Sequence, residues 1–232
     1  MLIAALLLAA QPISVAETDR TKTTYRAHRS PLCSEWSAVR NGGGAARLME
    51  AAYNNWFHGY VSGFNVYWHP RSGNILGQAT WNEIAAFIDV QCSGNQTKSV
   101  AQALDPLMTD LIKRQAHEKK GMPRPSVLTV QVTCRQWSDA KDDKVLRVFW
   151  GGAARGYLTA YNRWGRDTSG DFLLQNNDEL IDRWINDWCE KRSSSSILQS
   201  MDPFIKYIDK ERAAGRINPG SMPANELVVP IT

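Results

Sequence analysis

The chain has 232 residues, of which 43% are hydrophobic and 22% charged, and it contains nine tryptophans. These values are ordinary for a globular protein and exclude a disordered or fibrous chain. The formal net charge of +4 arises largely in segment 113–133, where five basic residues accompany one acidic residue. Because such a segment is typical of a solvated linker, the charge does not indicate a nucleic-acid partner.

The N-terminus has the pattern of a secretory leader. Residues 2–10 (LIAALLLAA) form a short apolar run, and Ser14-Val15-Ala16 then places small residues where a signal peptidase cuts. We expect residues 1–16 to be a signal peptide and 17–32 an N-terminal extension; a buried N-terminal helix is the alternative. No later apolar run is long enough to span a bilayer, so we expect no stable membrane insertion. An even number of cysteines, four, favours a periplasmic or secreted location.

An internal repeat organises the rest of the chain. Four blocks occur twice in the same order, and both copies include two cysteines. We therefore predict a tandem duplication with insertions between the blocks. The paired blocks are Cys33–Ser37 with Cys134–Ser138, Trp56–Phe64 with Phe149–Tyr157, Ile84–Cys92 with Ile181–Cys189, and Ser99–Pro106 with Ser196–Pro203.

Each copy has the signals of consecutive helices. Thr80 and Glu83 form a capping box, after which Ile84, Phe87 and Ile88 lie on one helical face. The corresponding positions in the second copy predict a cap at Asn177 and an apolar stripe of Ile181, Trp184 and Ile185.

The last helix of each copy has its own start signals. We expect Thr97 and Ser194 to cap the helix that follows the capped one, and Asp105-Pro106 and Asp202-Pro203 to end it and begin a last helix. A kink at each proline is the alternative.

These signals predict an all-α protein made of two tandem copies of a small four- to five-helix unit, each closed by a disulfide. Pairing Cys33 with Cys92 and Cys134 with Cys189 respects the duplication, whereas cross-pairing does not. Closing a loop of this length stabilises a small unit by about 4 kcal/mol. The predicted units are residues 33–120 and 134–213, with a linker at 121–133 and a tail at 214–232.

The middle helix of each copy contains paired glycines, Gly59 with Gly63 and Gly152 with Gly156. In a membrane this spacing indicates helix dimerisation. In a chain without a membrane span, we expect the small residues to let another backbone or a large aromatic side chain approach closely.

No catalytic pattern stands out. The four histidines, His28, His58, His69 and His117, lack partners at metal-binding spacing, and the cysteines are expected to be oxidised. The carboxylate pairs Asp142-Asp143 and Asp178-Glu179 each lie where a helix should begin, which explains them through the helix dipole. We therefore expect no catalytic residue, no metal and no cofactor, and hence no enzyme. An uncharacterised enzyme is the least favoured alternative.

Taken together, the parts of each copy resemble the HdeA/HdeB family of periplasmic acid-stress chaperones. The resemblance rests on an early cysteine, a helix of the type Gly-Tyr-Val-Ser-Gly-Phe (59–64), a capped helix that ends in Cys92, and a polar loop with a final helix. The second copy offers Gly152–Tyr157 and Cys189. Family members are typically single units that act through dimer dissociation, whereas this chain joins two units.

The resemblance implies a stress-response chaperone that loosens in acid and binds unfolded client proteins. Protonation of all carboxylates and of the four histidines would take the net charge from +4 to about +31, and the resulting repulsion would loosen each unit while the disulfides limit unravelling. Aromatic helix faces would then hold clients; core packing is the alternative role of these residues. The predicted partner-binding residues are Phe57, Tyr60, Phe64, Trp150 and Tyr157.

A second hypothesis is an immunity or inhibitor protein that neutralises a toxin or cell-wall enzyme. Tai-type immunity proteins of type VI secretion are also exported and helical, with disulfides and a helix centred on Gly-Tyr. They usually carry an additional cysteine near that helix, which this chain lacks.

Overall fold

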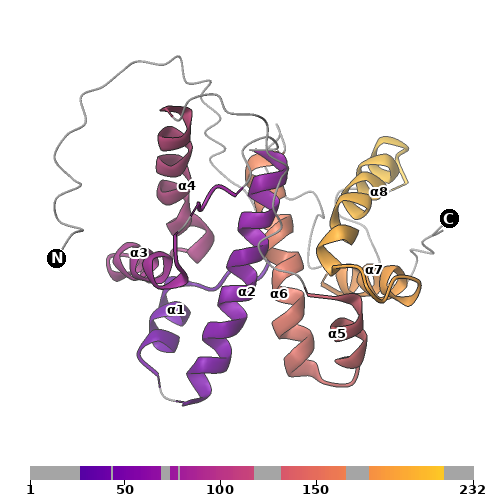
Figure 1. Cartoon of the computed structure of the whole chain (residues 1–232), viewed down its shortest axis with the longest axis horizontal. Helices are drawn as coiled ribbons and strands as arrows, with labels where there is room; N and C mark the ends of the chain where they lie inside the picture. Colours follow the sequence, from indigo (N-terminus) through magenta and orange to yellow (C-terminus); the bar gives the residue numbers. More distant parts are fainter. Residues whose placement is uncertain are drawn as a thin grey trace.

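The computed structural model describes residues 27–42, 44–68, 74–77, 79–117, 132–165 and 178–216, and these form an all-helical protein (Figure 1). The predicted fold class, a disulfide-closed all-α protein, is confirmed. The first half contains α1 (Cys33–Arg40), α2 (Gly44–Tyr67), α3 (Trp81–Ser93) and α4 (Val100–His117). The second half contains α5 (Cys134–Asp139), α6 (Lys144–Ala160), the π-helical turn η2 (Tyr161–Gly165), α7 (Asp178–Glu190), the 3₁₀ turn η3 (Ile197–Ser200) and α8 (Met201–Ala213).

Several predicted segments lie outside the described residues. These are the leader, the extension up to residue 26, residues 118–131 with most of the predicted linker, the predicted cap at Asn177, and the tail from residue 217. The division of the chain into two units with these boundaries therefore stays a prediction.

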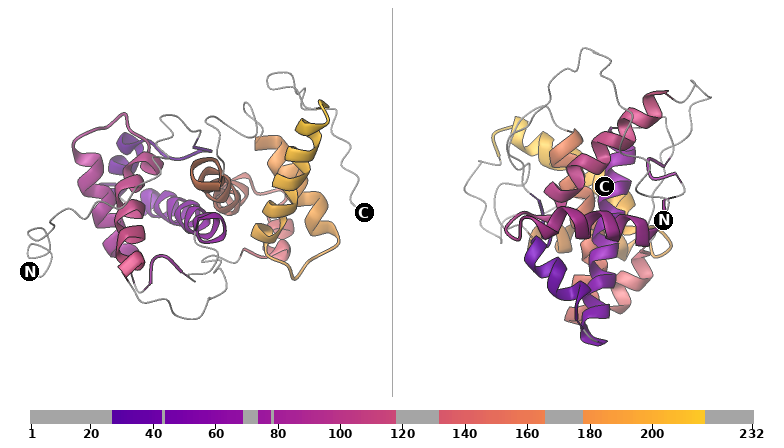
Figure 2. Two further views of the ribbon diagram at one scale, coloured as in Figure 1. Left: turned by 90° about the horizontal axis from the view of Figure 1, so that it is seen from above. Right: turned by 90° about the vertical axis from the view of Figure 1, so that its left-hand side faces the viewer.

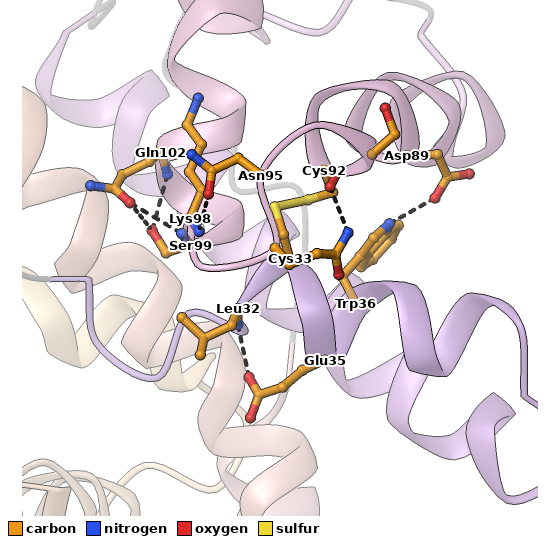
Figure 3. The surroundings of a disulfide bond; sticks show 12 residues. Leu32, Cys33, Glu35, Trp36, Asp89, Cys92, Asn95, Lys98, Ser99 and Gln102 are labelled. Carbon is orange, nitrogen blue, oxygen red and sulfur yellow. Dashed lines mark hydrogen bonds between the residues drawn. A yellow bond between two sulfur atoms is a disulfide. The ribbon is translucent and has the colours of Figure 1, made fainter.

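Both predicted disulfides are present. Cys33 bonds to Cys92 and Cys134 bonds to Cys189, and each pair has its Cα atoms 4.9 Å apart. In the first half the bond fastens the start of α1 to the end of α3 (Figure 3). All four cysteines are buried, so each bond lies inside a core rather than on the surface.

Hydrogen bonds around the first disulfide hold the segment before α1 against the loop before α4. The N–H of Cys33 donates to the carbonyl of Lys98 at 2.7 Å, and the indole N–H of Trp36 donates to Asp89 at 2.7 Å. Figure 3 shows both the disulfide and the Trp36–Asp89 bond beside one another. A buried tryptophan thus finds the hydrogen-bond partner that its indole requires.

The second half repeats this arrangement. The N–H of Cys134 donates to the carbonyl of Ser195 at 2.8 Å, and Trp137 donates to Asn186 at 2.8 Å. Descent of both halves from one duplicated unit stays a prediction, which these parallels support.

The ends of the helices partly follow the sequence signals. The Thr80–Glu83 capping box is present, with the Glu83 N–H donating to Thr80 Oγ1 at 3.3 Å. The caps predicted at Thr97 and Ser194 are wrong: Ser99 and Ser196 fill these places, each in a reciprocal bond with a glutamine three residues later. In each half the serine and the glutamine three residues later form a complete capping box. The helical segment therefore starts after this serine, two residues later than predicted.

The predicted break at Asp105-Pro106 is also wrong, because α4 continues through Pro106 to His117. In the second half a last helix does begin near Asp202-Pro203, but the predicted cap at Asp202 is wrong, because α8 begins at Met201 with Ser200 as its N-cap. Pro203 lies in the first turn of α8, where a missing N–H costs no helical hydrogen bond. The 3₁₀ turn η3 comes directly before α8, so the start of α8 differs from the start of α4.

The two halves meet along α2 and α6, which run parallel and side by side through the centre of the molecule (Figures 1 and 2). A Cβ atom built on Gly59 would lie 1.9 Å from the carbonyl oxygen of Ala153, and one built on Gly156 would lie 1.9 Å from that of Trp56. Only glycine permits such close backbones, so the prediction that the paired glycines admit another backbone is confirmed. We call this contact the α2–α6 seam.

If the predicted duplication holds, the contacts favour a different alignment of its two copies. The sequence comparison paired Gly59 with Gly152, but reciprocity across the seam pairs Gly59 with Gly156, one helical turn later. The same shift pairs Tyr60 with Tyr157, and both side chains are fully buried in their own halves. Repeated glycines at four-residue spacing make a one-turn slip easy to miss in sequence.

The end of each central helix reaches into the other half. Trp164, which follows α6, lies in the core of the first half and donates its indole N–H to Tyr60 Oη at 2.8 Å. Tyr67, at the end of α2, packs on the core of the second half and donates to Asp202. The two disulfide-closed halves therefore share one continuous helical interface.

Candidate functional site: the open end of the α2–α6 seam

Most of the predicted partner-binding residues lie in the core. Phe57, Tyr60, Phe64 and Tyr157 are at most 1% exposed, and Trp150 is partly buried against the core of the second half. In the folded protein no client reaches these four side chains. Their proposed role in binding would require the seam to open.

Exposed apolar side chains gather elsewhere. Seven large apolar side chains are exposed in the described part of the chain, and five of them lie in the first two turns of α2 and α6. Contiguous exposed apolar surface of this kind is typical of an interaction site. The five are Leu48 (47% exposed), Met49 (41%), Val145 (54%), Leu146 (38%) and Val148 (49%).

These residues continue the seam beyond the point where the helices touch closely. Near Gly59 the backbones are in direct contact, whereas a Cβ on Gly152 would lie 3.4 Å from the Ala52 carbonyl, an ordinary contact. In Figure 1 the two helices come together toward their C-terminal ends and spread apart toward their N-terminal ends. We call the five exposed residues and this end of the helix pair the open seam.

A groove of about 380 Å³ enters the open seam on one side. Met49 and Val148 line it together, which places the apolar turns of both helices on one surface. Small residues form part of its lining. The lining residues are Arg29, Ser30, Pro31, Glu35, Met49, Ala52, Tyr53, Trp56, Val148, Gly152 and Arg155.

The upper wall of the groove is a short strap, residues 27–31, that crosses from one half to the other. The N–H of His28 donates to Thr159 Oγ1 on α6 at 2.8 Å, and the His28 carbonyl accepts from the Trp56 indole on α2 at 2.8 Å. The N–H of Val100 donates to the Pro31 carbonyl at 2.8 Å. The strap thus fixes one edge of the groove to three helices.

Charges at this edge are mutually compensated. Arg155 has a side chain that is only 5% exposed, and it pairs with Asp178 at 2.7 Å and Asp182 at 3.0 Å. Arg29 on the strap also pairs with Asp178. Burial opposes ionisation of Asp178, but the two arginines outweigh it and hold the pKa of this carboxyl below its ordinary value.

Buried hydroxyl groups form a second polar cluster at the opposite end of the seam. Tyr67 and Tyr157 both donate to Asp202, the latter at 2.8 Å. Burial, reinforced by neighbouring groups, raises the pKa of both phenols far above the ordinary value. The bond from Tyr67 on α2 to Asp202 on α8 joins the two halves, whereas the bond from Tyr157 on α6 to the same carboxylate lies within the second half.

His58 is a further titratable group inside the fold. It lies on α2 beside Trp81, with ring centroids 6.5 Å apart. Burial lowers the pKa of His58 below its ordinary value, because the charged imidazolium loses water. This residue therefore links the stability of the first half to pH.

No group of three or more His, Cys, Asp or Glu side chains suited to a metal ion occurs in the described part of the chain. Within the same residues no helix combines the length and apolar character needed to cross a membrane. The expectations of no catalytic residue, no metal and no cofactor stay predictions. Two buried disulfides are typical of a protein from an oxidising, extracytoplasmic compartment.

Comparison of the chain with protein-family models, curated proteins and solved structures finds no significant match. The HdeA/HdeB and Tai-type resemblances therefore rest on the sequence pattern alone. Sequence reasoning missed the open seam, although Leu48-Met49 and Val145-Leu146 carried a signal. These apolar pairs lie about three turns before Gly59 on α2 and about two turns before Gly152 on α6.

Proposed function

We propose that this is an exported, non-enzymatic binding protein that holds a protein partner at the open seam at neutral pH. The observation that carries the proposal is the concentration of five exposed apolar side chains at one end of a helix pair. This surface is present in the folded state. It fits the inhibitor and immunity class, which requires a preformed site, better than a chaperone that must first unfold.

The location of the protein follows from the same proposal. The apolar leader pattern and the two disulfides support the periplasm or the extracellular space. A partner toxin or cell-wall enzyme would meet the protein there.

A capture experiment tests the proposal. The immobilised, disulfide-bonded protein is incubated at neutral pH with an extract of the compartment that it occupies. We expect one partner in a fixed stoichiometry, and we expect Val148→Asp and Met49→Asp to lose it. Val90→Asp is the matched control, because Val90 is 69% exposed on α3, away from the open seam. Capture that survives both open-seam substitutions would contradict the proposal.

An acid-activated chaperone is the second candidate, and His58 together with Asp178 specifically favours it. Acid would protonate both groups, which costs the fold stability because each has a lowered pKa. Loosening of the seam would then uncover Phe57 and Tyr60. This candidate predicts that the protein suppresses light scattering by an unrelated client at pH 2–3 but not at pH 7. Absence of suppression at pH 2–3 eliminates it.

A further inference from the structure

We propose that the open seam binds an acidic amphipathic helix of a different protein, which lies between the diverging ends of α2 and α6 as a third helix. The inference rests on the proposed function, and it adds the chemistry and shape of the partner.

The shape of the open seam suits a helix. Met49 on α2 and Val148 on α6 face one groove, whose lining includes the small residues Ala52 and Gly152. Leu48 lies next to Met49 on α2, and Val145 lies about one turn before Val148 on α6, so both add to the exposed apolar surface. Two diverging helices with small residues between them leave a groove that an apolar helix face fills, as in other helix-in-groove complexes.

The charge of this end favours an acidic partner. Both α2 and α6 begin here, so the positive ends of two helix dipoles lie at the same end of the helix pair. Neither helix has an acidic residue in its first turn, although acidic residues are the usual choice there. Their first turns instead carry Arg47, Lys144 and Arg147.

Several nearby carboxylates already have partners. Glu35, which lines the groove, accepts from the N–H of Leu32 at 2.7 Å. Asp143 caps α6 by accepting from the N–H groups of Val145 at 2.9 Å and Leu146 at 3.0 Å. Glu50 pairs with Arg40 at 2.7 Å. Asp139 and Asp142, both exposed before α6, are the further opposing charges. Glutamates on the polar face of a partner helix would complement the start of α2 and the exposed basic side chains Arg47 and Lys144.

The same charges disfavour a second copy of this chain as the occupant. Two copies joined through their open seams would bring four positive helix ends and two sets of basic first turns together. Like charges at an interface oppose association. A partner of opposite charge avoids this cost.

A pair of designed peptides tests the inference. Both are about 18 residues long and share one leucine face; one carries glutamate on its polar face and the other lysine. Binding to the disulfide-bonded full chain is measured at neutral pH by fluorescence anisotropy. We expect the glutamate peptide to bind at least tenfold more tightly than the lysine peptide, with the preference shrinking in high salt.

Substitutions locate the binding. Val148→Asp should weaken binding of the glutamate peptide at least tenfold, whereas Val90→Asp should leave it unchanged. Arg47→Glu combined with Lys144→Glu should abolish or reverse the preference for glutamate. Circular dichroism and thermal unfolding of each variant establish that it is folded, since all of these positions are exposed.

Three results would overturn the inference. They are equal or tighter binding of the lysine peptide, binding of neither peptide, and a wild-type dimer that Val148→Asp converts to monomer. The last result would make a second copy the occupant. Neither of the first two results affects the proposed function if a native partner is still captured through Val148. The proposed function and the acidic-helix inference therefore fail separately.

Discussion

Replacing Gly59 with alanine tests the seam that joins the two halves. The added Cβ would lie 1.9 Å from the Ala153 carbonyl oxygen and within 2.7 Å of the Ala153 Cα atom. Because these are backbone atoms of a packed helix, no side-chain rotation relieves the overlap. The helices would have to separate by about 1 Å or more, and such overpacking costs typically 1–3 kcal/mol and occasionally more.

Alanine also favours the helix over glycine by about 1 kcal/mol, which offsets part of this cost. Since the overlap is severe, we expect a net loss of about 2 kcal/mol, or about 6 °C in Tm for a protein of this size. Guanidinium unfolding of the oxidised protein, followed by far-ultraviolet circular dichroism, measures the change. Gly156→Ala should behave in the same way, because its Cβ would lie 1.9 Å from the Trp56 carbonyl.

Gly44→Ala supplies the matched control. Gly44 also lies on α2, but no described atom is within 4 Å of a Cβ built there. We expect this variant to be as stable as the wild type or more stable by up to about 1 kcal/mol. If Gly59→Ala were as stable as Gly44→Ala, the close parallel contact would be refuted.

Three further predictions follow from the described contacts. Peptide mapping without reduction should find Cys33 linked to Cys92 and Cys134 linked to Cys189, and a crossed linkage would be inconsistent with the fold. Loss of either bond should lower the free energy of unfolding by about 4 kcal/mol. The free energy of unfolding should fall as pH decreases below about 6.5, because the unfolded chain binds a proton at His58 before the folded protein does. His58→Gln should flatten this dependence of the unfolding free energy on pH. An unchanged pH dependence in the variant would argue against the role of His58. Tyr67→Phe should cost about 1–2 kcal/mol in denaturant unfolding by removing the bond to Asp202, whereas Tyr53→Phe, at a half-buried position in the groove, should cost little; equal effects would count against the shared interface.

Local features were readable from sequence because they depend on neighbours in the chain. The Thr80–Glu83 box and the apolar stripe around Ile84 follow from spacing along one helix. The pairing of the cysteines was predicted instead from the occurrence of two cysteines in each copy of the repeat, and it is confirmed. The start of α4 was misplaced, since Ser99 and Gln102 compete with Thr97 for the same role.

The relation between the halves depends on distant residues. No local signal distinguishes a glycine that contacts another backbone from one that faces an aromatic ring, so the parallel seam needed the structure. The crossing of Tyr67 and Trp164 into opposite cores is a consequence of that seam. The same geometry buries Tyr60 and Tyr157, and it leaves Met49 and Val148 exposed where the helices diverge.

Site-specific photo-crosslinking in intact cells tests the central claim most directly. A photoreactive amino acid is placed at position 148 or 49, with position 90 as the control, and cells are irradiated at neutral pH. The account predicts one discrete crosslinked partner from positions 148 and 49 and none from position 90. Crosslinks that are absent from the open seam, or equally strong from position 90, would contradict it.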